Sequence, residues 1–227
     1  MSFEQAGDHL AIALPGGTAL FTTRHGGVSD GPFASLNLGL WTDDDAARVR
    51  ENRARVARLS GGRIAQARQV HGTRVVAADP DAVEEADGQV TTERGVAAMA
   101  LTADCLPIAL VAREGVAMLH AGWRGLADGV IAAGVEALRA LGANHVAAAI
   151  GPGAGPCCYE VGDEVHAAFG TSGRTLDLKA LARERLGAAG VGAVHDCGLC
   201  TIHDERFFSH RRDRGITGRQ AGVAWRS

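Results

Sequence analysis

The stretch VAAMALTADCLPIALVAREGVAMLHAGWRG, residues 96–125, decides the fold. It contains three apolar runs of strand length, Val96 to Leu101, Leu106 to Ala112 and Val116 to His120, which short polar breaks separate. We expect these three runs to pair in one sheet. From Leu126 to near Gly142, apolar residues then recur every three or four positions, a pattern that predicts an amphipathic helix.

The rest of the chain mixes strand and helix patterns without a regular βαβ alternation. We predict strands at Leu10–Leu14, Ala19–Thr23, His145–Ile150 and Val191–His195, and helices from Asp43–Asp45 to Leu59, at Val161–Phe169 and at Leu178–Ala188. The tail from Phe207 to Trp225 is basic and then apolar. With no GxGxxG or GxxxxGK[ST] motif, this order favours an α/β fold, a mixed α+β sandwich, over a Rossmann or barrel fold. No linker or repeat divides it, so we expect a single domain over residues 1–227.

The composition excludes several classes of protein. Hydrophobic residues make up 46% and charged residues 22% of the 227, which is ordinary for a globular chain. The formal charge is −3 and the sequence has no long basic block, so we do not expect nucleic acid as a partner. The chain has neither a basic start with an apolar stretch after it nor a run of about 18 apolar residues. We therefore expect a cytoplasmic protein without a membrane span.

Three metal-ligand residues stand at the ends of apolar segments: His71 before a glycine, Cys105 after Asp104, and His120 at the end of the third run. Each has an ordinary explanation, a hydrogen-bonded histidine or a buried thiol beside a turn. If the segments converge, however, two imidazoles and a thiolate make a ligand set that suits zinc. Three protein ligands leave a position for water, which is the arrangement of a catalytic site. Asp104 could orient a ligand or transfer protons.

Two further groups of residues could carry chemistry. The sequence has five cysteines, an odd number, which favours thiols or metal ligands over a disulfide framework. We expect one residue of the Cys157-Cys158 pair to pack and the other to line the site. Cys197 and Cys200 have the spacing of a zinc knuckle or redox pair. Arginines beside glycine or serine, at Arg24 and from Arg211 onward, have a composition that suits phosphate binding.

The motifs TTRHGGVSDGPFASLNLG, QVHGTRV, ADG, TADCLPIAL, LHAGWRGL, GPGAGPCCYEVG and FFSHRRDRGITGRQAG occur in this order. Together they closely resemble the YfiH family, also called the polyphenol oxidase or laccase-domain family, from about Thr22 to Trp225. The resemblance implies that His71, Cys105 and His120 bind zinc. It also implies purine nucleoside phosphorylase activity on adenosine, inosine and methylthioadenosine, adenosine deamination, and a fold shared with a bacterial toxin deamidase.

We assign the site residues from within these motifs. Catalytic roles go to Asp104, Cys105 and Arg124, substrate binding to Arg24, Asn37, Gln69, Tyr159 and Arg211, and metal binding to His71, Cys105 and His120. The chain departs from the family at His210, where the family usually has tyrosine. We expect Zn²⁺ as the cofactor, with copper second, because only one three-ligand cluster can be assembled.

The sequence is also compatible with other functions. Cys105 could be a nucleophile activated by His120 in an amidase that edits peptidoglycan precursors. The laccase label would mean a copper polyphenol oxidase. A zinc-stabilised interaction module would need a fourth ligand, for which Cys158 is a candidate. For the leading hypothesis the partners are a purine nucleoside and phosphate, with no protein partner.

Overall fold

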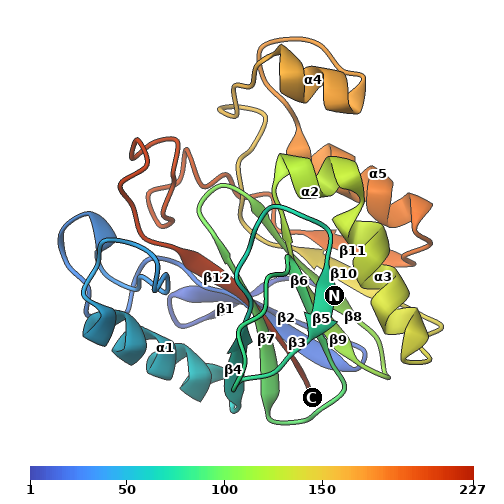
Figure 1. Ribbon diagram of the computed structural model, residues 1–227, viewed down its shortest axis with the longest axis horizontal. Coiled ribbons are helices and arrows are strands. Elements are labelled where there is room, and N and C mark those ends of the chain that lie inside the picture. Colours follow the sequence, from blue (N-terminus) through green and yellow to red (C-terminus); the bar gives the residue numbers. More distant parts are fainter.

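Two mixed six-stranded β-sheets pack face to face in the computed structural model, which describes all 227 residues (Figure 1). The first sheet has the order β1 (Glu4–Ala6), β2 (His9–Leu14), β3 (Gly17–Phe21), β12 (Gln220–Arg226), β7 (Val96–Thr102) and β4 (Arg63–Gln66). The second has the order β11 (Ala193–Asp196), β10 (Ala147–Ile150), β8 (Leu106–Val111), β9 (Val116–Ala121), β6 (Gly88–Thr91) and β5 (Val75–Ala77). In both sheets antiparallel pairs predominate and parallel pairs lie at an edge. The predicted mixed α/β sandwich is confirmed.

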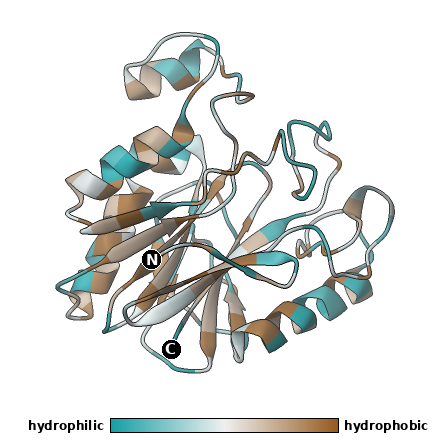
Figure 2. Ribbon diagram, turned by 180° about the vertical axis from the view of Figure 1, so that it is seen from behind, coloured by the Kyte–Doolittle hydropathy of each residue, from teal (hydrophilic) through white to brown (hydrophobic).

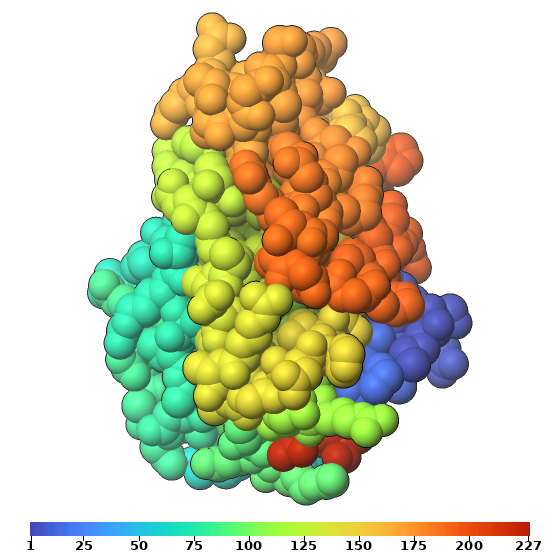
Figure 3. Space-filling view, turned by 90° about the vertical axis from the view of Figure 1, so that its right-hand side faces the viewer, coloured from blue at the N-terminus to red at the C-terminus, as the bar shows by residue number.

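Helices cover the outer face of each sheet. Helix α1 (Ala46–Ser60) packs on the first sheet, and α3 (Val130–Ala140) and α5 (Leu178–Ala188) pack on the second (Figure 1). Figure 3 shows α3 and α5 side by side on that face. The short helices α2 (Trp123–Asp128) and α4 (Asp163–Phe169) lie at the end of the molecule beyond them, and a 3₁₀ turn spans Gly31–Phe33. The layers therefore run helix, sheet, sheet, helix.

Small side chains fill the space between the two sheets. The core there includes Ala19, Ala98 and Ala100 of the first sheet and Ala109 and Ala149 of the second, and all five are at most 3% exposed. Larger leucine, valine, phenylalanine and methionine side chains complete this layer, and further leucines and valines lie on the outer faces, beneath the helices. Figure 2 shows the hydrophobic residues concentrated in these central strands. Because alanine lets the two sheets approach closely, a chain with 4% aromatic residues can still build a dense core.

Two expectations about the elements are wrong, and one strand has no counterpart among the predicted elements. The three apolar runs do not form one sheet, because β7 belongs to the first sheet whereas β8 and β9 belong to the second. The chain crosses between the sheets at Asp104, where φ is 97°. The helix expected from Leu126 is two helices, because Gly129 with φ of 104° breaks it after α2. The apolar tail forms β12, a strand between β3 and β7 that local periodicity does not identify.

The remaining predicted elements lie close to their expected positions. The carboxylate of Asp45 accepts a hydrogen bond from the Ala47 N–H (2.7 Å) at the start of α1, and Gly61 ends the helix with φ of 65°. Strands β1, β4, β5 and β6 are three or four residues long and were not predicted. None of the helices combines the length and the apolarity that crossing a membrane requires.

Candidate functional site

His71, Cys105 and His120 converge at one end of the two sheets. Strands β8 and β9 pair with Pro107 opposite His120, so Cys105, just before β8, lies beside that histidine. His71 reaches the same place from the loop between β4 and β5. The ligand atoms of the three side chains all lie within 4.8 Å of one another, and the two imidazole rings meet edge to face at 4.9 Å. This convergence is the condition under which the sequence predicts a metal site.

Asp87 orients two of the three ligands. Its Oδ1 lies 2.7 Å from Nδ1 of His120, so the other ring nitrogen, Nε2, is left for the cluster. The same carboxylate accepts hydrogen bonds from the backbone N–H groups of Val70 (3.1 Å), His71 (3.0 Å) and Gly72 (2.7 Å). Its side chain is 0% exposed. Asp87 stands in the ADG motif, but its place in the sequence alone predicts no role for it.

Glycines make room for the cluster. A Cβ at Gly122 would lie 2.9 Å from Cδ2 of His71 and 3.1 Å from Sγ of Cys105. A Cβ at Gly125 would lie 2.7 Å from the carbonyl oxygen of Gly72. All three distances are shorter than ordinary van der Waals contacts, so the start of α2 can approach the His71 loop only because these residues lack side chains.

Cys105 and His120 shift each other's protonation. Burial raises the pKa of the Cys105 thiol, but the charge and hydrogen bonds of His120 and His71 outweigh this and lower it to about 6. Burial lowers the pKa of His120, whereas the Cys105 thiolate and Asp87 raise it to about 9. Near neutral pH these two side chains therefore form a thiolate–imidazolium pair, with the Asp87 carboxylate behind the imidazolium.

The donor set fits a zinc ion. Two imidazole nitrogens, a thiolate and a carboxylate behind one histidine are features of zinc sites in enzymes. The Cys158 sulfur, the candidate fourth ligand, lies with Cys157 and Cys200 in a different cluster. A closed four-ligand site, which the interaction-module hypothesis requires, is therefore not formed by Cys158.

A cavity of about 410 Å³ opens above the three ligands. This volume lies within the range of small-molecule sites. Trp41, Thr102 and Arg219 line the cavity without having been predicted, because they come from separate segments that only the fold brings together. The lining residues are Gly39, Trp41, Thr42, Gln69, His71, Leu101, Thr102, Ala103, Asp104, Cys105, His120, Tyr159, His210, Arg211 and Arg219.

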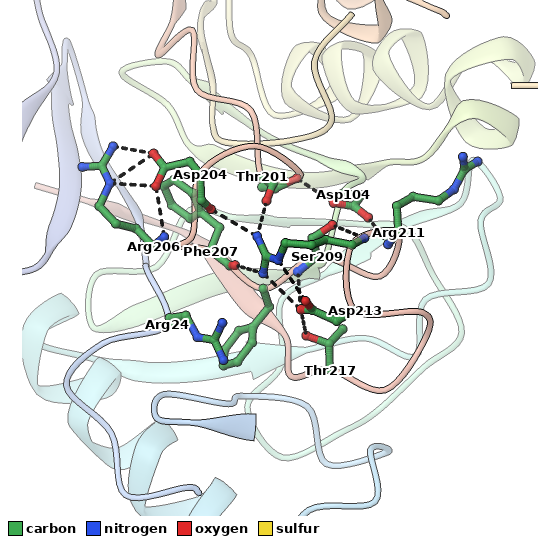
Figure 4. A network of polar contacts seen from close by, with 12 residues as sticks. Arg24, Asp104, Thr201, Asp204, Arg206, Phe207, Ser209, Arg211, Asp213 and Thr217 are labelled. Atoms are coloured by element: carbon green, nitrogen blue, oxygen red, sulfur yellow. Dashed lines mark hydrogen bonds and ion pairs between the residues drawn. The ribbon is translucent and has the colours of Figure 1, made fainter. Parts of the chain in front are cut away.

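Asp104 is the only carboxylate that lines this cavity. Its Oδ1 accepts a hydrogen bond from Oγ1 of Thr201 (2.7 Å), and its Oδ2 accepts one from the backbone N–H of Arg211 (2.8 Å) (Figure 4). Its φ of 97° is rare for a residue with a side chain. Such a conformation persists where the surroundings fix it, and here the two hydrogen bonds do so.

The loop around Arg211 is held by an internal polar network (Figure 4). Arg212 donates to the carbonyl oxygens of Thr201 (2.9 Å) and Phe207 (2.7 Å) and contacts the carboxylate of Asp213 (2.9 Å). Arg211 instead lines the cavity. Arg212 therefore fixes the loop, whereas the neighbouring Arg211 faces the cavity.

Tyr159 and Gln69, which the sequence predicts to bind substrate, both line the cavity. The Arg211 guanidinium lies over the Tyr159 ring, 5.0 Å from its centroid. Burial, with the nearby Cys105, raises the pKa of Tyr159 to about 12, so its hydroxyl stays protonated. Gln69 uses its side-chain amide on the backbone of Leu101, donating to O (2.7 Å) and accepting from N–H (2.8 Å). That amide therefore fixes the loop before His71.

Three predicted residues lie outside the cavity lining. Arg24 donates to the Ala34 carbonyl (2.7 Å) and lies over the Phe208 ring. Arg124 lies over the Trp123 ring and 3.7 Å from Glu164. Asn37 is completely buried, and its Oδ1 accepts hydrogen bonds from the backbone N–H groups of Gly39 (3.0 Å) and Arg219 (2.8 Å). Asn37 thus positions two lining residues without reaching the cavity.

The chain is similar to known proteins over most of its length. The sequence model of the family described as multi-copper polyphenol oxidoreductase laccase matches residues 18–227. A Pseudomonas aeruginosa protein named purine nucleoside phosphorylase is 46% identical over 225 residues, covering 91% of this chain and 92% of its own. A Corynebacterium glutamicum protein of the same name is 37% identical over 231 residues, covering 91% of this chain and 93% of its own.

Solved structures match over almost the whole chain. YlmD of Geobacillus stearothermophilus has a TM-score of 0.90 at 37% identity and covers 99% of this chain and 98% of its own. YfiH of Bacillus licheniformis has a TM-score of 0.91 at 33% identity, with 98% of both chains covered. The chain therefore belongs to the multi-copper polyphenol oxidoreductase laccase family, which is the YfiH family that its motifs resemble.

Proposed function

We propose that this chain is a zinc-dependent purine nucleoside phosphorylase that acts on adenosine, inosine and methylthioadenosine and also deaminates adenosine. Two relatives that cover nine-tenths of the chain carry the name purine nucleoside phosphorylase, which supports the first activity. The observation that carries the proposal is the position of the His71, Cys105 and His120 cluster at a cavity that also holds two arginines.

The cavity walls match the two halves of the proposed substrate pair. Trp41, 61% exposed, together with Leu101 and the Tyr159 ring, offers apolar surface for a flat purine base. Arg211 and Arg219 offer guanidinium groups, which grip phosphate through parallel hydrogen bonds. Arg219 already uses Nη1 on the carbonyl oxygens of Thr217 and Gly218, so its remaining N–H groups are the ones left for a ligand.

The residues divide the proposed reaction between them. In phosphorolysis a phosphate oxygen forms a bond to C1′ of the ribose, the bond from C1′ to the base nitrogen breaks, and the departing base takes a proton. Arg211 and Arg219 hold the phosphate, and Trp41 holds the base. Zinc bound by His71, Cys105 and His120 would supply a Lewis acid and lower the pKa of a bound water. In deamination a water oxygen forms a bond to C6 of adenine and the bond from C6 to the amino nitrogen breaks. Asp104, the cavity's carboxylate, transfers a proton from that water to the nitrogen, which leaves as ammonia.

A second candidate is a cysteine hydrolase that acts on amide bonds of peptidoglycan precursors. The observation that favours it is the spatial arrangement of Cys105, His120 and Asp87. The thiolate lies beside the imidazolium, and the imidazolium is oriented by the carboxylate. A thiolate that ligates zinc is not free to attack a carbonyl. Activity that rises when zinc is removed would therefore select the hydrolase.

The test is a screen of the three nucleosides with and without phosphate, in which free base and ammonia are measured in the same samples. We expect base release to depend on phosphate for all three substrates and ammonia release from adenosine not to depend on it. Chelation should abolish both activities, and added zinc should restore them. Base release without phosphate, or no release at all, would contradict the proposal.

A further inference from the structure

A second cluster of ligand-type side chains lies apart from the first. The sulfur atoms of Cys157, Cys158 and Cys200 lie within 4.8 Å of one another, and those of Cys157 and Cys158 are 2.8 Å apart. Cys157 is exposed and the other two are partly exposed, so solutes can reach the cluster. None of these residues lines the cavity. Cys197, which the sequence pairs with Cys200 by spacing, is not in the cluster.

The backbone fixes the two segments that carry these thiols. Gly153 and Cys200 form a bridge between them, and the Thr201 N–H donates to the Gly153 carbonyl (3.1 Å). The N–H of Gly155 donates to Sγ of Cys200 (3.2 Å). A Cβ at Gly155 would lie 3.0 Å from Cβ of Cys200, so this close approach needs glycine there. The paired backbone therefore holds the two segments that carry the thiols side by side.

The ligand set of this cluster consists of sulfur alone. No imidazole or carboxylate belongs to it, whereas the first cluster has two imidazoles. Soft thiolates select Cu(I), zinc or iron–sulfur clusters. Structural zinc takes four protein ligands and an iron–sulfur cluster takes four cysteines, but only three sulfurs meet here. Zinc sites with three protein ligands and a water include histidine, so this set of three thiolates matches the soft Cu(I) ion best.

We propose that Cys157, Cys158 and Cys200 bind one Cu(I) ion as a three-thiolate site, separate from the His71, Cys105 and His120 cluster. Binding displaces the thiol protons and changes no oxidation state. Sulfurs that share one ion must stand farther apart than the 2.8 Å between Cys157 and Cys158, and the exposed Cys157 is free to turn outward. The site does not depend on the enzymatic function proposed above.

The test is an anaerobic titration of zinc-supplied protein with Cu(I) held by the colorimetric competitor bicinchoninate. We expect the parent chain to take one equivalent of copper, and Cys197→Ser, the matched control, to do the same. Cys157→Ser and Cys200→Ser should leave the copper with the competitor. Because Cys157 is exposed, its serine variant should fold like the parent, which circular dichroism checks.

The coordination sphere gives an independent measurement. X-ray absorption of the copper-loaded parent should show three sulfur neighbours and no imidazole, and Cys105→Ser should still take up copper. The proposal is overturned if the parent does not take copper from the competitor, or if Cys157→Ser takes it as well as the parent does. Imidazole neighbours, or loss of copper in Cys105→Ser, would assign the ion to the first cluster and would equally overturn it.

Discussion

At the scale of single residues, the site depends on a buried side chain that does not line the cavity. Asp87 ties His120 and the His71 loop together through one buried carboxylate. A partner behind a metal-binding histidine fixes which ring nitrogen faces the metal and strengthens that nitrogen as a donor. We infer that Asp87 is a positioning residue, whose loss acts through His71 and His120.

Replacing Asp87 by asparagine should weaken zinc binding by about 10–100-fold. The amide has no negative charge to stabilise the His120 imidazolium. Its NH₂ group would also face the backbone N–H groups that donate to a carboxylate oxygen of Asp87 in the parent. Competition with a chelator measures the affinity. Asp128→Asn, at an exposed aspartate on α2, is the matched control and should leave it unchanged. Equal affinities in the two variants would mean that Asp87 does not position the ligands.

The Cys105 thiol of metal-stripped protein should stay reactive well below the usual pH. Its pKa is about 6, whereas an ordinary thiol has a pKa of about 8.5. The thiolate, and the stability that it gives the folded protein, is therefore lost as the pH falls through about 6. The imidazolium side of the pair is lost as the pH rises through about 9. Iodoacetamide labelling of the Cys105 peptide, followed by mass spectrometry, gives the midpoint. His120→Ala should raise it, and a parent midpoint near 8.5 would refute the pairing.

At the scale of elements, the turn from β9 into α2 brings the cluster together. The chain leaves His120 at the end of the strand and turns through Gly122 into the helix, directly against the His71 loop. This strand, turn and helix unit leaves no space for a side chain at Gly122. The geometry of the ligands is thus set by how closely two backbones approach.

Gly122→Ala should lose metal and turnover while it leaves most of the fold intact. The added methyl would contact His71 and Cys105 at 2.9 and 3.1 Å and push them apart. Metal content and base release measure the loss. The control is Gly187→Ala in α5, where nothing lies within 4 Å and the change should stabilise the protein by about 0.5–1 kcal/mol. A metal content in Gly122→Ala equal to that of the parent would show that the space is not needed.

Arg211→Lys should raise the phosphate concentration that phosphorolysis requires and spare deamination. Lysine keeps the charge but cannot form two parallel hydrogen bonds to phosphate. Arg24→Lys and Arg124→Lys serve as controls, because neither residue lines the cavity. Base release against phosphate concentration, with ammonia release alongside, separates the activities. If all three variants behave like the parent, the phosphate does not lie at Arg211.

At the scale of the whole molecule, the two sheets bring distant segments to one cavity. Strand β12, from the end of the chain, lies between β3 and β7, and the Ala221 N–H donates to Oγ1 of Thr22 from 199 residues away. This pairing is what places Arg219, just before β12, at the same cavity as Trp41 and Cys105. The order of the strands in the sheets therefore determines which residues meet at the cavity.

The sequence predicts the parts of this arrangement that residue chemistry marks. Histidine and cysteine at strand ends pointed to the metal ligands, and apolar periodicity located most helices and the longer strands. Asp87 was missed because one aspartate before a strand looks like a turn residue. Local periodicity does not encode which strands pair over long distances in the chain. For this reason the sequence indicates neither the sheet to which β7 belongs nor the position of Trp41 and Arg219 at the cavity.

The most direct test of the central claim is the metal content and phosphorolysis of the parent and of Cys105→Ala, both purified without added metal. We predict about one zinc per chain in the parent, with two nitrogen and one sulfur protein ligands. Cys105→Ala should lose both the zinc and phosphate-dependent base release, while its melting temperature stays close to that of the parent, because an open catalytic site contributes less to folding than a closed structural one. Parent protein free of metal that retains full phosphorolysis would contradict the account.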